Sequence, residues 1–389
     1  ETVNYPIVGN PIPLQTMEKG PDGNLYLSGY PGGKGAVYNP ETNESEAFTL
    51  GQAEGMAALD DKMYFGVYPG ATIFELDVNS PTLAPKQIYD IPNQDRPFVI
   101  RSIQDKLFIG TIPDYGKLGG SLTILDPSSI EDTVVHNQAI TGLAEKDGLL
   151  YGSTTVAGGL GIEPSEDAAK IFVWDIAKGE KITEFVPEIP DMTILPRMIS
   201  GMSLGPDDLL WSATGGTILA IDPETLDIVK SKSIYPEIED YGRWRPIQIR
   251  WGEDGLMYTT LAGKITVIDP ITLESETLAA TELMTLGDDG NIYYADGPSV
   301  MKIEVSKKAT LESVLQFIED LKDESVIAHS LSKKLENSVN QAIHHRDGGR
   351  NDQSEKHVLK ALKHLDKAKP SDITPAAKAA IKQMLESSQ

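Results

Sequence analysis

The sequence predicts an all-β seven-bladed β-propeller followed by a small all-α helical bundle domain. Three observations lead to this fold class. A short acidic turn that runs into an apolar-aromatic pair recurs seven times along the chain. Most copies are followed by an apolar run that ends in Asp or Asn, as in ILDP and AIDPET. From Thr310 onward the apolar residues recur with a period of about 3.6, which is typical of helices. We therefore expect a propeller in residues 1–305 and a helical module in residues 306–389.

The seven acidic turns define the blades. They read DGNLY (22–26), DDKMY (60–64), DKLF (105–108), DGLLY (147–151), DDLLW (207–211), DGLMY (254–258) and DGNIY (289–293). Their aromatic residues are spaced by 38, 44, 43, 60, 47 and 35 residues, close to the roughly 40–50 residues of a four-stranded blade. These aromatic side chains are expected in the core between blades, and the longest interval is expected to hold an inserted loop.

The two ends of the repeat region predict how the ring closes. The seventh unit ends after about three strands near Val305, whereas TVNYPIV (2–8) precedes the first unit and belongs to no blade. An N-terminal strand that pairs with the last blade would remove an open sheet edge.

The helical module begins with LESVLQFIEDL and ends with a helix that Thr374 caps and Pro375 begins. DGGRND and KPSD separate its helices. Residues 306–389 carry 14 Lys and Arg against 12 Asp and Glu, while residues 1–305 carry 20 against 46. The propeller is therefore the strongly acidic part of the chain.

Composition excludes several classes of partner and chemistry. A net charge of −24 repels nucleic acid, and no apolar run is long enough to span a membrane. The absence of cysteine excludes disulfides and thiolate sites. The sequence begins at Glu1 without Met or a signal-peptide profile, so we expect a mature chain that is secreted or associated with the cell surface.

Two resemblances extend this interpretation. The segments SLSKKLENSVNQAI, KHVLKALKHLDKAK and ITPAAKAAIKQMLE resemble the FIMAH-type helical module of secreted Gram-positive proteins, with a departure at HHRDGGRND, where we expect a longer connection. This resemblance implies a secreted location and attachment to a cell-surface component. The propeller resembles secreted carbohydrate-active propellers, including polysaccharide lyase families, in architecture.

Basic and polar residues are predicted to gather at one end of the channel. RPFVIR (96–101) and RPIQIR (245–250) are near repeats, which indicates equivalent positions in two blades. Counting back about eleven residues from the aromatic residue of each blade places Arg96, Gln138, Arg197 and Arg245 at the starts of the innermost strands. Their neighbours and the loops between second and third strands would add His136, Asn137, Arg243, Trp244, Tyr30, Tyr68, Tyr115, Lys34 and Lys117. Arg101 and Arg250 are expected deeper in the channel.

These residue types suit a polysaccharide that contains uronate. Arginine binds carboxylates through two hydrogen bonds, and aromatic rings offer flat faces to sugars. A lyase also needs a base, for which His136 is the first candidate, with Tyr30 or Tyr68 as acid or alternative base. The alternatives are a propeller that binds a glycan or protein without catalysis, and a glycoside hydrolase that uses Glu163, Glu166 and Asp167 of the inserted loop.

Ordinary structural roles compete with these assignments. Each arginine has acidic residues available as partners on neighbouring blades, and the Tyr-Pro-Gly segments also suit simple turns. No cofactor is required, although one or two acidic turns are candidates for calcium. Five histidines lie in the module, at positions 329, 344, 345, 357 and 364, and their spacing favours solvated side chains over a zinc site.

Overall fold

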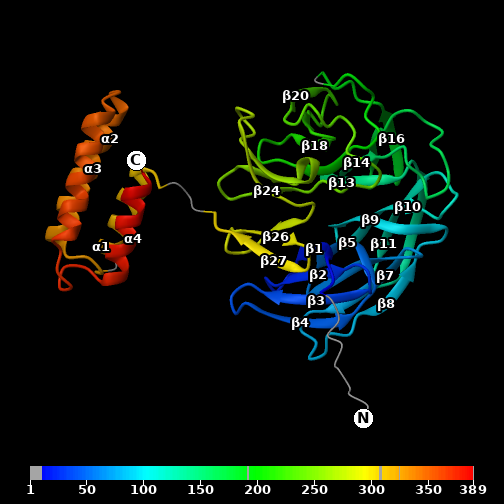
Figure 1. The fold of residues 1–389 in the computed structure, drawn as a ribbon, viewed down its shortest axis with the longest axis horizontal. Coiled ribbons are helices and arrows are strands. Elements are labelled where there is room, and N and C mark those ends of the chain that lie inside the picture. The colour runs from blue at the N-terminus through cyan, green and yellow to red at the C-terminus, as the bar shows by residue number, and fades with distance from the viewer. Residues whose placement is uncertain (1–10, 191, 306–308, 324, 389) are drawn as a thin grey trace, which may run out of the picture. The chain divides into compact units, whose positions relative to one another are not determined.

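The structure is a computed structural model that describes residues 11–190, 192–305, 309–323 and 325–388. Contacts divide the chain into two compact units, Glu1–Val305 and Ser306–Gln389. In Figure 1 the first unit is a ring of sheets and the second a group of helices. The expected N-terminal strand at residues 2–8 falls outside the described residues.

The described part of the first unit contains seven antiparallel sheets, one for each blade. Blades one to four comprise β1 (Leu14–Lys19), β2 (Leu25–Gly29), β3 (Lys34–Asn39), β4 (Glu44–Thr49); β5 (Gln52–Leu59), β6 (Lys62–Tyr68), β7 (Thr72–Asp77), β8 (Lys86–Asp90); β9 (Gln94–Ile103), β10 (Lys106–Pro113), β11 (Gly120–Asp126), β12 (Glu131–Asn137); and β13 (Ile140–Lys146), β14 (Leu149–Thr154), β15 (Ile171–Asp175), β16 (Glu180–Phe185).

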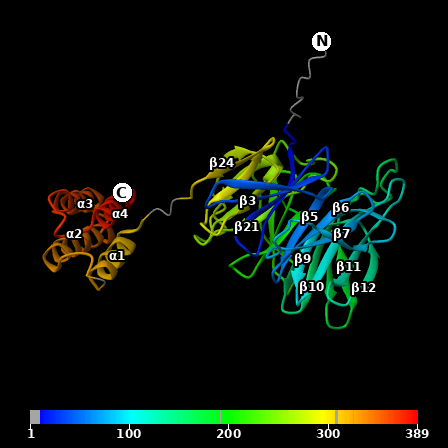
Figure 2. The same ribbon diagram turned by 90° about the horizontal axis from the view of Figure 1, so that it is seen from below.

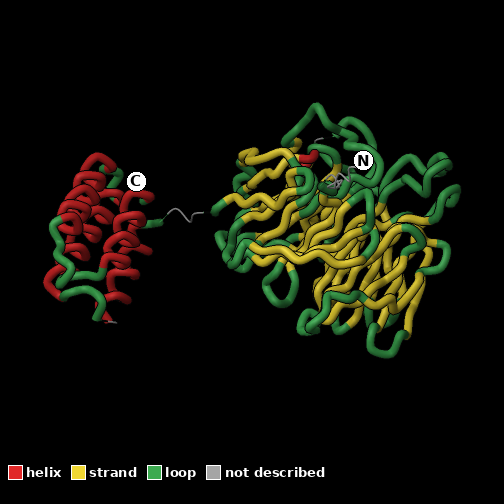
Figure 3. Tube along the Cα trace, turned by 60° about the horizontal axis from the view of Figure 1, so that its bottom comes forward, coloured by secondary structure: helices red, strands yellow, loops and turns green. Residues whose placement is uncertain are grey.

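Blades five to seven comprise β17 (Ser200–Leu204), β18 (Leu210–Thr214), β19 (Thr217–Ile221), β20 (Ile228–Ser233); β21 (Ile249–Trp251), β22 (Met257–Thr259), β23 (Lys264–Ile268), β24 (Ser275–Ala280); and β25 (Met284–Leu286), β26 (Ile292–Asp296), β27 (Ser299–Ile303). Six sheets have four described strands and the last has three. The predicted seven-bladed propeller is confirmed. Figure 3 shows the first unit built of strands, with one short 3-10 turn, η1 (Leu261–Gly263).

The first strand of each blade borders a central channel. Residues of β1, β5, β9, β13, β17, β21 and the turn before β25 line one common cavity there. The pairing of the first and second strands shifts register in blades one to five, which marks bulges close to the starts of these strands. At Gly201, which has a φ of 74°, an added Cβ would lie 2.7 Å from the Ile247 carbonyl oxygen, so only glycine allows this approach between blades.

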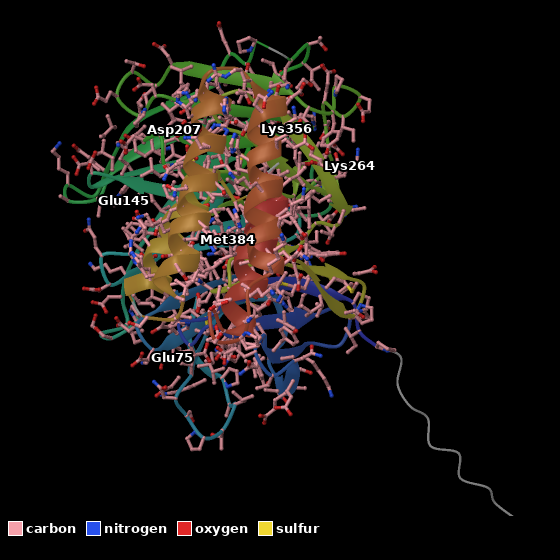
Figure 4. All side chains as sticks on the ribbon, turned by 90° about the vertical axis from the view of Figure 1, so that its left-hand side faces the viewer. Glu75, Glu145, Asp207, Lys264, Lys356 and Met384 are labelled. Carbon is pink, nitrogen blue, oxygen red and sulfur yellow. The ribbon has the colours of Figure 1, made fainter. Side chains whose placement is uncertain are left out.

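The aromatic residue that follows each acidic turn is buried between blades, as predicted; the seven are Tyr26, Tyr64, Phe108, Tyr151, Trp211, Tyr258 and Tyr293. Some of the acidic turns accept hydrogen bonds from these aromatic side chains. Asp207 accepts a hydrogen bond of 3.0 Å from Trp211 Nε1, and Asp254 accepts one of 2.6 Å from the Tyr258 hydroxyl. Tyr64 donates instead to Glu75, at 3.0 Å. Figure 4 labels Asp207 and Glu75. In blades five and six the carboxylate of the acidic turn therefore satisfies a polar atom at the edge of the core.

The second unit is a four-helix module made of α1 (Leu311–Asp323), α2 (His329–Asp347), α3 (Asn351–Asp366) and α4 (Pro375–Ser387). Figure 2 shows these helices side by side. Leucine, isoleucine, valine and alanine side chains from all four helices form one core. Thr374 caps α4 by accepting a hydrogen bond of 3.3 Å from the Ala377 amide, as the sequence predicts. No helix among the described residues is long and apolar enough to cross a membrane.

The expectation of a longer helix connection at HHRDGGRND is wrong. Helix α2 continues through both histidines to Asp347, and α3 begins at Asn351, so only three residues connect them. The rings of His345 and His357 stack at 5.1 Å between centroids. Among the described residues, no group of three or more His, Cys, Asp or Glu side chains could hold a metal ion.

We expect the helical module to lose stability as the pH falls from 4.5 toward 2. Hydrogen bonds from Arg346, including one of 2.5 Å from Nη2, lower the pKa of Glu312 from 4.5 to about 2. A lowered folded-state pKa means that protonation in this range favours the unfolded state. Thermal unfolding followed by the helical circular dichroism signal should therefore depend less on pH in Glu312→Gln than in the unmodified chain. An unchanged pH dependence would contradict a role for this ion pair.

Candidate functional site at the channel rim

A hollow of about 550 Å³ lies at the end of the channel where the innermost strands begin. We call it the rim hollow. Its charged and aromatic lining residues are Glu54, Arg96, Arg243, Trp244, Arg245, Glu282 and Asp296. They come from β5, β9, the segment before β21, the segment before β25 and the end of β26. Four residues that the sequence predicted at the rim therefore line it together, because the fold brings Arg96 beside the distant consecutive residues Arg243, Trp244 and Arg245.

Arg96 lies deepest among these arginines. It belongs to β9, its side chain is 14 % exposed, and it forms an ion pair with Glu54 of the neighbouring blade, which is 8 % exposed. Burial raises the pKa of the Glu54 carboxyl, and the charge of Arg96 opposes that shift. The Arg96 guanidinium carbon also lies 3.9 Å from the centroid of the Tyr68 ring. Arg96 is consequently held on one side by a carboxylate and on another by an aromatic face.

Arg245 shares the local sequence of Arg96 but has a different environment. It lies in the loop before β21, its side chain is 53 % exposed, and Nη1 lies 2.7 Å from Glu282. The Tyr241 hydroxyl donates to the same carboxylate at 2.8 Å. Both arginines are thus paired with acids of a neighbouring blade, which is the structural alternative that the sequence left open for them.

Trp244 forms an aromatic wall of the rim hollow. The guanidinium carbons of Arg96 and Arg243 lie 5.1 Å and 5.5 Å from its ring centroid. Its φ of 53° is unusual for a bulky residue, which indicates backbone strain. Trp244 Nε1 and Arg96 Nε are both buried without a hydrogen-bond partner among the described residues. Such strain and unpaired donors concentrate at functional sites.

Arg243 differs from the other two arginines because it is exposed and takes part in none of the ion pairs between described residues. Its observed contact is with the Trp244 ring. A guanidinium beside an indole can bind a carboxylate while the ring covers an apolar surface. Arg243 is therefore the arginine of the rim hollow whose charge remains available.

The two tyrosines proposed for catalysis have different surroundings. The Tyr68 hydroxyl lies 2.7 Å from that of Tyr115, so a loop of blade two meets a loop of blade three beside Arg96. This hydrogen bond raises the pKa of Tyr68 to about 12. Tyr68 and Tyr115 contact Arg96 or each other but do not line the rim hollow themselves. Tyr30 is exposed and, like Lys34, does not line it either. Lys34 instead lines a separate hollow along blade one.

His136 and its neighbours are not brought to Arg96. His136 lies on β12, the outermost strand of blade three, whereas Arg96 lies on β9, the innermost strand. Three strand spacings separate the two strands, or about 14 Å. Asn137 Oδ1 accepts a hydrogen bond from Lys181 of blade four, and Gln138 Nε2 donates to the Ala168 carbonyl at 3.2 Å. The strand count across the blade thus separates His136 and Asn137 from Arg96. Gln138 precedes β13, the innermost strand of blade four, as predicted, but it does not line the rim hollow.

Other predicted residues also have structural partners. Arg197 Nε lies 3.6 Å from Asp240, and Lys117 Nζ lies 2.8 Å from Asp114. Neither Arg197 nor Lys117 lines the rim hollow. In both cases a nearby carboxylate accounts for the basic side chain.

The inserted loop of blade four connects β14 with β15 and packs against the loops beside it. Gly159 N donates to the Lys117 carbonyl at 2.9 Å, and Val156 N donates to the Arg197 carbonyl at 2.9 Å. These hydrogen bonds hold the loop against its neighbours, and none of its residues lines the rim hollow. The carboxylates considered for hydrolysis are exposed on it; they are Glu163, Glu166 and Asp167, and Glu166 pairs with Lys170.

The acidic partners of the arginines are the residues that sequence reasoning missed. Glu54 and Glu282 contact arginines that lie 42 and 37 residues away along the chain. Both glutamates occur just before or within the first strand of a blade, at a position similar to that of the arginines. Comparing equivalent positions in all seven repeats for acids, as well as for bases, would have identified them.

The helical unit has a recognisable family. Residues 311–387 match the FIMAH domain. This match covers the helices of the second unit and agrees with the resemblance noted in its sequence. A search of curated proteins gave no match.

Solved structures similar to this chain are β-propellers. A streptogramin B lyase structure has a TM-score of 0.57 at 15 % identity and covers 77 % of this chain and 96 % of its own. A catalytically inactive virginiamycin B lyase from Staphylococcus aureus, solved with quinupristin, has a TM-score of 0.56 at 15 % identity, covering 75 % and 94 %. The WD40 propeller domain of Doa1 has a TM-score of 0.54 at 11 % identity, covering 77 % and 95 %. At these identities the likeness establishes the fold alone.

Proposed function

We propose that this protein binds a polysaccharide that contains uronate units, and that the rim hollow is the binding site. The observation that carries this proposal is the Trp244 ring flanked by Arg243 and Arg96 in an open hollow of about 550 Å³. The ring offers a flat apolar surface to a sugar face, and Arg243 offers two parallel donors to a carboxylate.

The paired residues of the hollow suit the remaining groups of a sugar. The Arg96–Glu54 and Arg245–Glu282 pairs present donors and acceptors side by side. Sugar hydroxyls both donate and accept hydrogen bonds, so they can bind to such pairs without breaking them. A positive charge outside these pairs, that of Arg243, is needed for a polyanion because the acidic propeller repels it at long range.

Binding is tested with a soluble polyuronate and the same polymer after methyl esterification, which removes the carboxylate charge. Calorimetry should detect tighter binding of the charged polymer. Trp244→Ala and Arg243→Ala should each raise the dissociation constant about tenfold, because a hydrogen bond or stacking contact of roughly 1.5 kcal/mol is lost. Arg197→Ala, which removes an exposed arginine outside the hollow, should leave the constant unchanged. Equal binding of both polymers, or an equal loss in all three variants, would contradict the proposal.

A second candidate function is β-elimination by a polysaccharide lyase at the same site. The observation that favours it is the Tyr68–Tyr115 hydroxyl pair beside the Arg96 guanidinium. With a pKa of about 12, Tyr68 suits proton donation to a leaving oxygen better than proton abstraction at neutral pH. Two propellers of similar fold are lyases by name, so this architecture can carry such chemistry.

The lyase candidate is tested by the ultraviolet absorbance of an unsaturated product after incubation with the polyuronate. Tyr68→Phe should remove at least about 99 % of the turnover while leaving polymer binding intact, since acid–base catalysis contributes about a hundredfold or more. Binding without any absorbance change would leave the protein as a non-catalytic glycan-binding propeller.

We also propose that the FIMAH module attaches the propeller to the surface of the cell that exports it. The proposal rests on the match of residues 311–387 and on the charge of the module, which is close to neutral beside an acidic propeller. Residues 306–389 alone should sediment with cell-wall preparations, and residues 1–305 alone should not. The reverse distribution would refute this role.

A further inference from the structure

Two arginines and one glutamate meet inside the channel, below the rim hollow. Arg101 of β9 and Arg250 of β21 occupy equivalent positions in blades three and six, and both line the channel cavity together with Glu18 of β1. Each arginine donates from Nη1 to the carbonyl of the preceding isoleucine, at 3.0 Å and 3.2 Å. The two guanidiniums are therefore held in the same way at opposite parts of the ring.

The charges of this group do not balance. Arg250 Nη2 donates to Glu18 at 2.6 Å, whereas Arg101 forms no ion pair among the described residues. The remaining carboxylate of the cavity, Glu54, is already paired with Arg96. Burial and the nearby charge of Arg250 lower the pKa of Arg101 to about 10, while the charge of Glu18 opposes that shift, so Arg101 keeps its proton at neutral pH. The positive charge of the half-buried Arg101 side chain is therefore left without an ion pair among the described residues.

Several polar side chains that line the cavity already have hydrogen-bond partners other than Arg101. The hydroxyls of Thr16, Thr141 and Ser200 donate to the backbone carbonyls of Ala53, Ile199 and Thr141. The Gln248 side-chain oxygen accepts a hydrogen bond from the Met284 amide at 2.8 Å. The guanidinium N–H groups are consequently the charged donors that remain available to a bound species, beside the side-chain amides of Gln15 and Gln248.

The size of the cavity limits what this species is. Its volume is about 70 Å³, and a single water requires roughly 10–15 Å³ by the same measure. A halide ion with a few waters fits, but a sugar ring does not. A charge favours an ionic partner more as it loses hydration, and the side chains of Arg101 and Arg250 are both partly buried.

We propose that the channel binds one small monovalent anion of chloride size at Arg101 and Arg250. This site is separate from the rim hollow and its ligand differs from a glycan, so the inference does not depend on the proposed function. The anion would accept hydrogen bonds from both guanidiniums, compensate the charge of Arg101 and link blades three and six.

The test uses the full chain and chloride as the probe, with binding measured from the line broadening of the chloride magnetic resonance signal. Arg101→Met should weaken binding at least about tenfold, because a hydrogen bond to a charged group is lost. Glu18→Gln should tighten binding about tenfold, because it frees a second guanidinium. Arg197→Met, which removes an exposed arginine outside the channel, should change nothing.

A crystal soaked in bromide should place an anomalous scattering peak beside both arginines. If Arg101→Met does not fold, chloride binding by Glu18→Gln and the position of bromide in the crystal still test whether the channel binds an anion. Unchanged or weaker binding in Glu18→Gln, an equal effect of Arg197→Met, or no bromide peak in the channel would each overturn the proposal.

Discussion

Replacing Trp211 with alanine should lower the free energy of unfolding of the propeller by about 4 kcal/mol. The Trp211 side chain is fully buried on β18, and its ring meets the Trp251 ring of the next blade edge-on, with centroids 5.9 Å apart. Truncation would leave a cavity between blades five and six and would leave Asp207 without the indole N–H.

The measurement is denaturant unfolding followed by tryptophan fluorescence. All four tryptophans lie in residues 1–305, so the signal reports the propeller alone. Ile271→Ala is the control because Ile271 is apolar but 83 % exposed, and it should change stability by no more than about 0.5 kcal/mol. A decrease of less than about 1 kcal/mol in the free energy of unfolding of Trp211→Ala would show that packing between blades five and six does not depend on Trp211.

Replacing Arg96 with methionine should destabilise the propeller by about 3 kcal/mol at neutral pH, because Glu54 is then left buried and charged without its partner. The double change Arg96→Met with Glu54→Gln should recover most of this loss, since a neutral amide costs less to bury. Unfolding of the single and double variants by denaturant tests the pair directly.

The pH dependence of Arg96→Met gives an independent test of the same pair. Burial already raises the pKa of Glu54 above its ordinary value of 4.5, and loss of Arg96 should raise it further. A raised folded-state pKa means that this group supports folding fully below 4.5 and loses that contribution as the pH rises through the folded pKa. Arg96→Met should therefore become less stable from acid toward neutral pH, relative to the double variant. Parallel pH profiles for the two would contradict the assignment of the loss to Glu54.

The repeated local patterns were sufficient to predict the architecture. Tyr26, Trp211 and Tyr293 are buried as expected because each follows an acidic turn at a fixed interval, and both the turn and the strand after it depend on neighbours in sequence. The same holds for the module, where a helical period and the Thr374 cap are local signals.

Prediction of the site was less complete because the position of a residue in the repeated sequence does not specify how far its strand lies from the central channel. His136 precedes the fourth blade by only a few residues, yet it lies on the outermost strand of the third. Arg96 and Arg245 share a motif, yet one is 14 % and the other 53 % exposed. Whether an arginine lies in a strand or in the loop before it depends on the length of the preceding loop, which the motif does not record.

By itself, the sequence determined the number of blades, the residues buried between them, the division into an acidic propeller and a helical module, and the presence of arginines near the channel. Only the tertiary structure decided which carboxylates pair with Arg96 and Arg245, that Arg243 and Trp244 share a hollow, and that Arg101 forms no ion pair with any residue the structure describes. The reason is physical. Turns and amphipathic periods arise from residues close in sequence, whereas an ion pair across the ring depends on closure of all the blades, which brings together groups as far apart as Glu18 and Arg250.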